Sequence, residues 1–315
     1  MKGFILLVLA VFAAVGTVES CGSCRTMKWA ICDVDSASGC TCKLTLDETG
    51  SPQPIDCEKL VPKCFLMKAE MYRARNKLSV RGSIAGKPVE TAFVDNDGIY
   101  DPDCEADGRF KAKQCNKTEE CWCVNSAGVR RTDKGDKNIK CEELVETYWI
   151  RLDLKHTANA TNVDATSLKE GLGKLLEKRY GYDKTLIDKV QYDPDGRFIV
   201  ADLKKEMGKP GPNLGNMAYY MEKDLKVLPL FTSQEKVSLE AGTQNLEMEK
   251  ILVYYVDEKA PTFTMQHLSG GIIAVIVVVV LAVVIGILLL FFCNRRRKQQ
   301  YSKTQITPAS PSLST

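Results

Sequence analysis

The chain has 315 residues with 13 cysteines, two histidines and a formal net charge of +3 at neutral pH. This charge is small for the length, and it gives no reason to expect nucleic-acid binding. The isolated His156 and His267 argue against a catalytic triad or an HExxH metal site, and no G-x-S-x-G elbow or phosphate loop occurs. The sequence therefore predicts a protein that is not an enzyme, and we expect no cofactor and no metal.

Residues 1–20 have the layout of a secretory signal peptide: Lys2 precedes an apolar run over 4–15, and small and polar residues follow up to Ser20. The apolar run is too short to span a bilayer as a stable anchor. Cleavage after Gly16 and cleavage after Ser20 both fit the pattern, and we prefer Ser20. The sequence thus predicts an exported protein.

Twelve cysteines lie between Cys21 and Cys141. An even number in an oxidising compartment predicts that all of them are paired. The spacings Cys40-x-Cys42 and Cys121-x-Cys123 leave one residue between the sulfurs, so closure within either pair is strained and each cysteine needs a partner elsewhere. Zinc binding is a remote alternative, because structural zinc sites usually show paired two-residue cysteine spacings or nearby histidines, and the only histidines, His156 and His267, are isolated.

The first six cysteines define a module over residues 21–60. This stretch has little apolar sequence, so disulfides must provide most of its stability. A second set of six defines a module over residues 61–141. In this module Pro102-x-Cys104, Gly108-x-Phe110, Gln114-Cys115, Cys121-Trp122-Cys123-Val124 and Gly128 resemble the thyroglobulin type-1 repeat. The resemblance implies disulfides from Cys64 to Cys104, Cys115 to Cys121 and Cys123 to Cys141.

Several residues of the second module are candidates for function. Trp122 is expected to pack in the disulfide layer rather than to contact a partner. The polar, glycine-containing turn of Asn125, Ser126, Ala127 and Gly128 is expected to be exposed, and we place an interaction surface there. Arg81, Arg130 and Arg131 are possible sites for trypsin-like proteases, with a solvated basic surface as the alternative. Asn116 and Asn159 lie in N-glycosylation sequons.

Residues 142–263 contain no cysteine and must bury their own core. Residues 147–154 alternate as a strand, and Asp164 or Ser167 can cap a helix that carries leucines at helical spacing. Asp195-Gly196 predicts a hairpin between strands over 190–192 and 198–203. A second helix over 215–225 and a strand over 251–256 complete the order βαββαβ. The predicted fold class is α+β, with a split, ferredoxin-like antiparallel sheet that carries its helices on one face.

Residues 268–293 are predicted to form one transmembrane helix, because the charge-free stretch is roughly 36 Å long as an α-helix. Arg295, Arg296, Arg297 and Lys298 follow it, so residues 294–315 are expected to be a cytoplasmic tail of a type I protein. Ala282 and Gly286 share one helix face and permit close helix packing. Cys293 is a candidate for palmitoylation, with an unmodified residue as the alternative.

The order of these segments is similar to that of the family of the epithelial cell adhesion molecule and the trophoblast antigen, as are strings such as Tyr254-Tyr255-Val256-Asp257-Glu258-Lys259-Ala260-Pro261. In the first module the resemblance implies disulfides from Cys21 to Cys40, Cys24 to Cys57 and Cys32 to Cys42.

The same resemblance implies a glycoprotein of the lateral epithelial membrane and cell junctions that forms cis homodimers and organises cell–cell contacts. Tetraspan junction proteins are further partners that it implies. The alternative function is inhibition of papain-type cysteine proteases by the thyroglobulin repeat, which requires its loops to be free.

Overall fold

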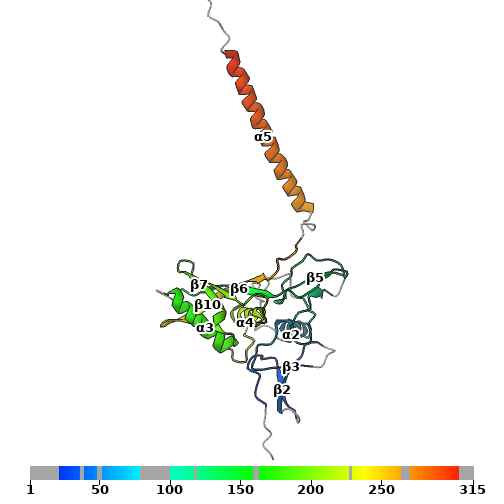
Figure 1. The fold of residues 1–315 in the computed structure, drawn as a ribbon, viewed down its shortest axis with the longest axis vertical. Coiled ribbons are helices and arrows are strands. Elements are labelled where there is room, and N and C mark those ends of the chain that lie inside the picture. The colour runs from blue at the N-terminus through cyan, green and yellow to red at the C-terminus, as the bar shows by residue number, and fades with distance from the viewer. Residues whose placement is uncertain are drawn as a thin grey trace, which may run out of the picture. The chain divides into compact units, whose positions relative to one another are not determined.

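A computed structural model describes residues 21–35, 39–47, 52–78, 100–116, 119–158, 163–226, 229–263 and 270–304 (Figure 1). The chain divides into two compact units, Met1–Phe263 and Thr264–Thr315. The predicted signal peptide at residues 1–20 lies outside the described residues.

The first cysteine module is a small antiparallel sheet stapled by three disulfides. Its strands are β1 (Ile31–Asp35), β2 (Gly39–Leu44) and β3 (Gln53–Ile55), in that order across the sheet. The disulfides join Cys21 to Cys40, Cys24 to Cys57 and Cys32 to Cys42, the pairing that the family resemblance implies. Cys32 and Cys42 stand opposite each other in the β1–β2 register, so their link crosses the ladder directly.

The second module contains α2 (Lys63–Arg75) and a short hairpin of β4 (Lys113–Cys115) and β5 (Cys121–Cys123). Its disulfides are Cys64–Cys104, Cys115–Cys121 and Cys123–Cys141, again the implied pairing. Trp122 is 5% exposed and makes an edge contact with Tyr100 at a centroid distance of 5.2 Å. Because it also packs with Phe110 and Val124, Trp122 is a core residue, as predicted.

The third region forms one five-stranded antiparallel sheet in the order β7-β8-β6-β10-β9. This confirms the βαββαβ order and adds one edge strand. The elements are β6 (Thr147–His156), α3 (Ala165–Leu175), η2 (Leu176–Tyr180), η3 (Lys184–Leu186), β7 (Ile187–Asp193), β8 (Phe198–Lys204), α4 (Leu214–Lys226), β9 (Ser238–Ala241) and β10 (Gln244–Asp257).

The sequence analysis missed β9 and the first half of β10. A turn at Gly242, with φ +61°, connects these two strands as a tight hairpin. Leu239 and Ala241 are buried with Leu246 across the hairpin, so an alternating pattern was present on both sides of the glycine. The pattern is short and interrupted by charged residues, which is why it did not stand out.

Alternation along β6 places its apolar side chains under the helices. Ile150, Leu152 and Leu154 are at most 2% exposed, and the residues between them are only partly buried. Asp164 caps α3 by accepting hydrogen bonds from the backbone amides of Thr166 and Ser167, as predicted. Leu168, Leu172 and Leu176 then lie one turn apart, and all three are fully buried against the sheet.

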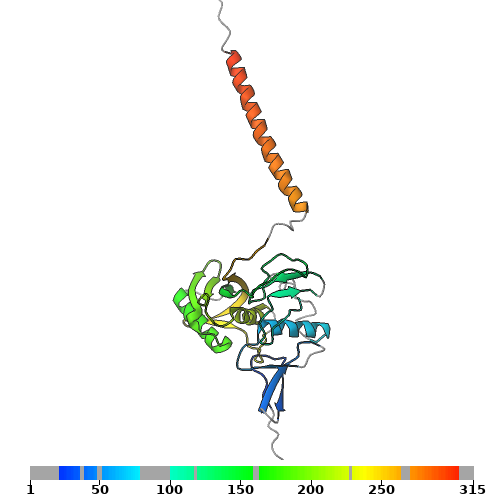
Figure 2. The ribbon, with the colours of Figure 1, turned by 45° about the vertical axis from the view of Figure 1, so that its right-hand side comes forward.

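The larger apolar cluster of the first unit contains residues from all three regions, and a smaller one around Phe110 and Trp122 lies within the second module. Figure 2 shows α2, in light blue, beside α4 of the third region, with the blue strands of the first module projecting below it. The Tyr220 hydroxyl on α4 donates to the carbonyl oxygen of Thr26 at 3.0 Å and accepts from the amide of Val61 at 3.2 Å. Met27 and Leu44 of the first module belong to the same apolar cluster. Packing against the third region therefore supports a module that was expected to rely mainly on its disulfides.

Lys63 is buried at the junction between α2 and the third region. Its side chain is 4% exposed overall, and its ammonium lies 5.3 Å from the ring centroids of both Tyr219 and Tyr255. Burial lowers the pKa of Lys63 to about 8, partly offset by the carboxylate of Glu222 and reinforced by Lys223. Holding a charged ammonium at this junction is therefore costly at neutral pH.

Replacement of Lys63 should change how stability depends on pH. Between pH 8 and 10.5 the unfolded lysine keeps a proton that the folded lysine has lost, so the free energy of unfolding should rise with pH from about 8, by up to about 1.4 kcal/mol per pH unit. Lys63→Met should abolish this rise between pH 7 and 9.5, below the range where tyrosines ionise. Urea unfolding of residues 21–263 checks it, and an unchanged pH slope in Lys63→Met would contradict it.

Candidate interaction surface

The turn at residues 125–128, predicted to be an exposed contact loop, is packed against the third region. Asn125 and Ser126 are each 2% exposed, Ala127 is fully buried and Gly128 is partly buried. The Ser126 hydroxyl accepts a hydrogen bond from the amide of Thr147 at 3.0 Å. The prediction of an exposed loop is wrong, because these polar groups satisfy buried backbone groups of the same chain instead of meeting solvent.

The dibasic pair that was predicted as a protease site is also held by the fold. Arg131 is 9% exposed and forms an ion pair with Asp257, its Nε lying 2.8 Å from Oδ2. Arg130 is partly buried, with its guanidinium 5.8 Å from the ring centroid of Phe263. A protease needs a mobile, exposed backbone, so the structure contradicts Arg131 as an open site. Arg81 lies outside the described residues.

Of the two glycosylation candidates, Asn116 is exposed and Asn159 lies outside the described residues. The side-chain amide of Asn116 donates to a carboxylate oxygen of Glu120 at 2.8 Å. Both remain predictions.

Residues 270–293 of the predicted transmembrane segment lie in one long helix, α5 (Gly270–Thr304), and residues 268 and 269 lie outside the described residues. The stretch Ala274–Phe292 has a mean hydropathy of 3.6 and is long enough to cross a membrane. Ala282 and Gly286 both lie in this stretch, and Cys293 follows it directly. The helix continues beyond the predicted end at residue 293, because the arginine, lysine and glutamine residues that follow are good helix formers.

The outward face of the sheet is the largest feature that the sequence analysis left without a role. Alternate residues on β6, β8 and β10 point away from the apolar core, and the strand register places them side by side. We call this set the sheet face. Its residues are Trp149, Arg151, Asp153, Lys155, Phe198, Val200, Asp202, Lys204, Leu252 and Tyr254.

Large apolar groups on the sheet face are open to solvent. Phe198 is 38% exposed, Leu252 41% and Tyr254 49%. Phe198 lies on β8 and the other two lie on β10, so the exposed apolar groups flank the charged residues of β6 on both sides. Aromatic and aliphatic groups in such a patch are typical of protein–protein contacts.

A polar cluster around the paired Arg151 and Asp202 lies at the centre of the sheet face, and in it one buried carboxylate oxygen of Asp153 has no hydrogen-bond partner. Arg151 binds Asp202 through two hydrogen bonds, of 2.8 and 3.0 Å, and the Trp149 indole donates to the same carboxylate at 3.1 Å. Hydrogen bonds from Arg151 and Trp149 lower the pKa of Asp202, whereas burial raises the pKa of Asp153. The Lys204 ammonium lies 4.6 Å from the Trp149 ring centroid. A partner would therefore meet a prearranged, largely neutralised surface.

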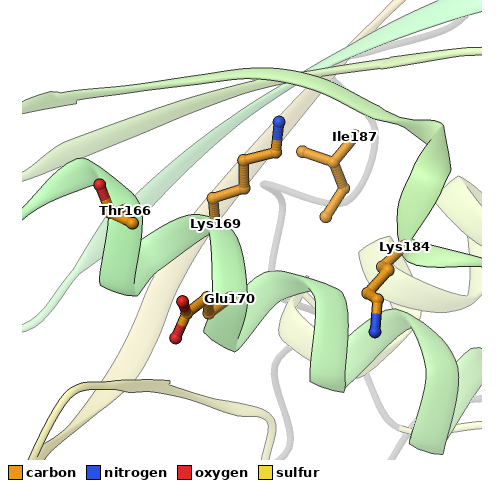
Figure 3. A pocket seen from close by; sticks show the side chains of 5 residues that line it. All are labelled: Thr166, Lys169, Glu170, Lys184 and Ile187. Carbon is orange, nitrogen blue, oxygen red and sulfur yellow. The ribbon is translucent and has the colours of Figure 1, made fainter.

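A shallow pocket of about 280 Å³ lies beside α3 and is lined by Thr166, Lys169, Glu170, Lys184 and Ile187 (Figure 3). Its two cations already have partners: Lys169 donates to the carbonyl oxygen of Asp188, and Lys184 pairs with Glu177 at 3.5 Å. We therefore assign no ligand to this pocket.

These features define a class of protein: a disulfide-stapled unit that joins a thyroglobulin-type module to an antiparallel α+β domain, on a chain whose described residues include one helix long and apolar enough to span a membrane. Residues 74–141 match the family model "Thyroglobulin type-1 repeat", and residues 147–257 match "EPCAM/Trop-2, C-terminal".

The chain belongs to the EPCAM/Trop-2 family. It is 43% identical to human "Epithelial cell adhesion molecule" over 277 residues, covering 86% of this chain and 83% of the relative. It is 40% identical to human "Tumor-associated calcium signal transducer 2" over 272 residues, covering 86% and 81%. The mouse protein "Epithelial cell adhesion molecule" is 40% identical and covers 86% and 84%. The chain is a non-enzymatic, single-pass plasma-membrane protein of this family.

Sequence reasoning found the inward face of β6 but gave no function to the outward one. A signal was available, because Trp149 and Arg151 alternate with buried residues in the strand. Alternation alone, however, marks every half-exposed strand. Only the sheet register shows that exposed apolar residues on β8 and β10 adjoin these positions.

Substitution of Gly215 should test the docking of the 125–128 turn. A Cβ at Gly215, in the first turn of α4, would lie 2.7 Å from the Cβ of Ala127 and 2.8 Å from its Cα. Gly→Ala ordinarily stabilises a helix. Here we expect Gly215→Ala to lower the free energy of unfolding by about 1–3 kcal/mol through overpacking, measured by urea unfolding. Adding Ala127→Gly should recover part of the loss, and a stabilised Gly215→Ala protein would show that the turn is not packed there.

Proposed function

We propose that the chain is an epithelial cell-surface adhesion protein that forms cis homodimers through the sheet face and organises cell–cell contacts. The observation that carries this proposal is the exposed apolar area of Phe198, Leu252 and Tyr254 on a rigid sheet. Membership of a family whose relatives include the "Epithelial cell adhesion molecule" supports the cellular setting.

A second copy of the chain is the occupant that we propose for the sheet face. The cationic groups of Arg151 and Lys204 are paired with Asp202 and Asp188 in the same chain. A face whose charges are already neutralised favours a mixed, largely apolar partner surface over a strongly charged ligand. Two membrane-anchored copies are also confined to the same plane, which raises their effective concentration.

The proposed topology is type I, with residues 294–315 in the cytoplasm, because a basic cluster follows the span. The lateral membrane and cell junctions are the proposed location. Ala282 and Gly286 would allow close helix contacts within the dimer or with a tetraspan junction protein.

Inhibition of papain-type proteases has less support. That function requires free loops on the thyroglobulin repeat, and the turn after Cys121-Trp122-Cys123 is buried in the same chain. Titration of residues 21–263 against a lysosomal cysteine protease should therefore give no inhibition at nanomolar concentration.

A charge placed in the sheet face should break the dimer. Leu252→Arg buries an unpaired cation on association, at a cost of about 2–4 kcal/mol, so we expect the yield of cross-linked dimers on cells to fall at least tenfold. Ile31→Arg is the matched control, because Ile31 is 62% exposed on the N-terminal hairpin. Equal dimer yields for the two variants would exclude the sheet face as the interface.

Bead aggregation with the same variants tests the adhesive part of the proposal. Beads coated with the wild-type protein are expected to aggregate, and beads coated with Leu252→Arg to remain dispersed. Aggregation that is insensitive to Leu252→Arg would separate adhesion from dimerisation.

A further inference from the structure

The last described segment of the first unit lies alongside the second cysteine module. We call residues 257–263 the exit segment, since it leads from β10 toward the transmembrane helix in sequence. The amide of Thr262 donates to the carbonyl oxygen of Arg131 at 2.9 Å. Thr132 and Thr262 form a parallel bridge. The exit segment is thus added to the edge of a different module.

The Arg131 side chain holds this arrangement together. Its Nε donates to Asp257 Oδ2 at 2.8 Å, and its Nη2 donates to the carbonyl oxygens of Lys259 and Ala260, the latter at 3.0 Å. The side chains of Arg131 and Asp257 are only 10% and 8% exposed. One guanidinium therefore binds the carboxylate of Asp257 and two backbone carbonyl oxygens of the exit segment, in a site that is nearly closed to water.

The second carboxylate oxygen of Asp257 also accepts hydrogen bonds. Its Oδ1 accepts hydrogen bonds from Asn125 Nδ2 and Thr147 Oγ1, each at 2.8 Å. The carboxylate thus joins the second module, β6 and the end of β10. Loss of the Arg131 contact would leave a buried, uncompensated charge, so the network is expected to open as a unit rather than bond by bond.

Two further contacts hold the exit segment beside this network. The Glu258 amide donates to the carbonyl oxygen of Glu146 at 2.9 Å, and Lys259 forms an ion pair with Glu143. Endopeptidases bind substrates as extended strands whose backbone groups are free to pair with the enzyme. Neither the exit segment nor the backbone around Arg131 is free to pair with an enzyme while these bonds persist.

We propose that Arg131 is a clasp that protects two scissile regions at once, and that opening it makes both available to trypsin-class endopeptidases. The first region is the dibasic pair itself, and the second is the bond after Lys259. In each case water adds across the peptide bond, whose C–N bond breaks to leave a carboxylate and an ammonium group.

The disulfides give the two cuts different consequences. A cut after Arg131 leaves both pieces joined, because Cys123 and Cys141 flank it in one disulfide. A cut after Lys259 lies beyond all six disulfides, so it separates the first unit from the transmembrane helix. The first cut would also break the segment that carries the clasp.

Limited trypsin digestion of the full chain on intact cells tests the clasp, with new termini quantified by mass spectrometry. Asp257→Asn keeps the size of the side chain and removes its charge. We expect it to speed cleavage after Arg131 and after Lys259 at least tenfold. Arg131→Met removes its own cleavage site and should speed cleavage after Lys259 to a similar degree.

Arg109→Met is the matched control, because it removes a guanidinium of the same module whose pair with Asp107 is exposed, at 61% and 55%. It should leave both cleavage rates unchanged. Cleavage after Arg151, in the central strand, reports global unfolding and should stay at the wild-type rate in every variant. The proposal is overturned if Lys259 cleavage in Asp257→Asn stays within twofold of wild type, or if cleavage after Arg151 accelerates equally.

Discussion

The fold of the first unit depends on one large hydrophobic core to which all three regions contribute. The two cysteine modules are too small and too polar to bury enough apolar area, so their disulfides hold the backbone while the third region supplies a surface to pack on. Tyr220 shows the arrangement at one residue: its ring is buried among apolar groups, and its hydroxyl binds backbone groups of both cysteine modules. The boundaries between regions in the sequence are therefore not boundaries between independently packed units.

This shared core decides which surfaces remain for function. It turns the 125–128 turn inward, where Ser126 and Asn125 satisfy backbone and carboxylate groups of the third region. It also removes Arg131 from solvent and sets it against Asp257. What remains open is the sheet face, on the side of the sheet away from the core. In our proposal, recognition therefore lies on the sheet face and not on the loops of the repeat.

Agreement between sequence and structure was best where one local force dominates. The Asp164 cap, the turn between β7 and β8 and the alternation along β6 each depend on neighbouring residues, and all three were predicted. The errors have a different origin. Polar residues at a glycine turn have the same composition whether they meet water or a buried backbone group, so exposure of Asn125 and Ser126 could not be read locally. The same limit applies to Arg131, because its partner lies 126 residues away.

The sequence by itself determined the membrane span, the cysteine-rich outer half, the βαββαβ order and the family. Each of these features depends on a run, a spacing or a motif of a few dozen residues at most. Over such lengths, hydrophobic length and backbone propensity act directly. Only the tertiary structure decided that three regions share one core, that the repeat's turn and dibasic pair face inward, and that the sheet face stays uncovered. Those outcomes depend on long-range packing, in which the free energy of burying a group is set by partners that are distant in the chain.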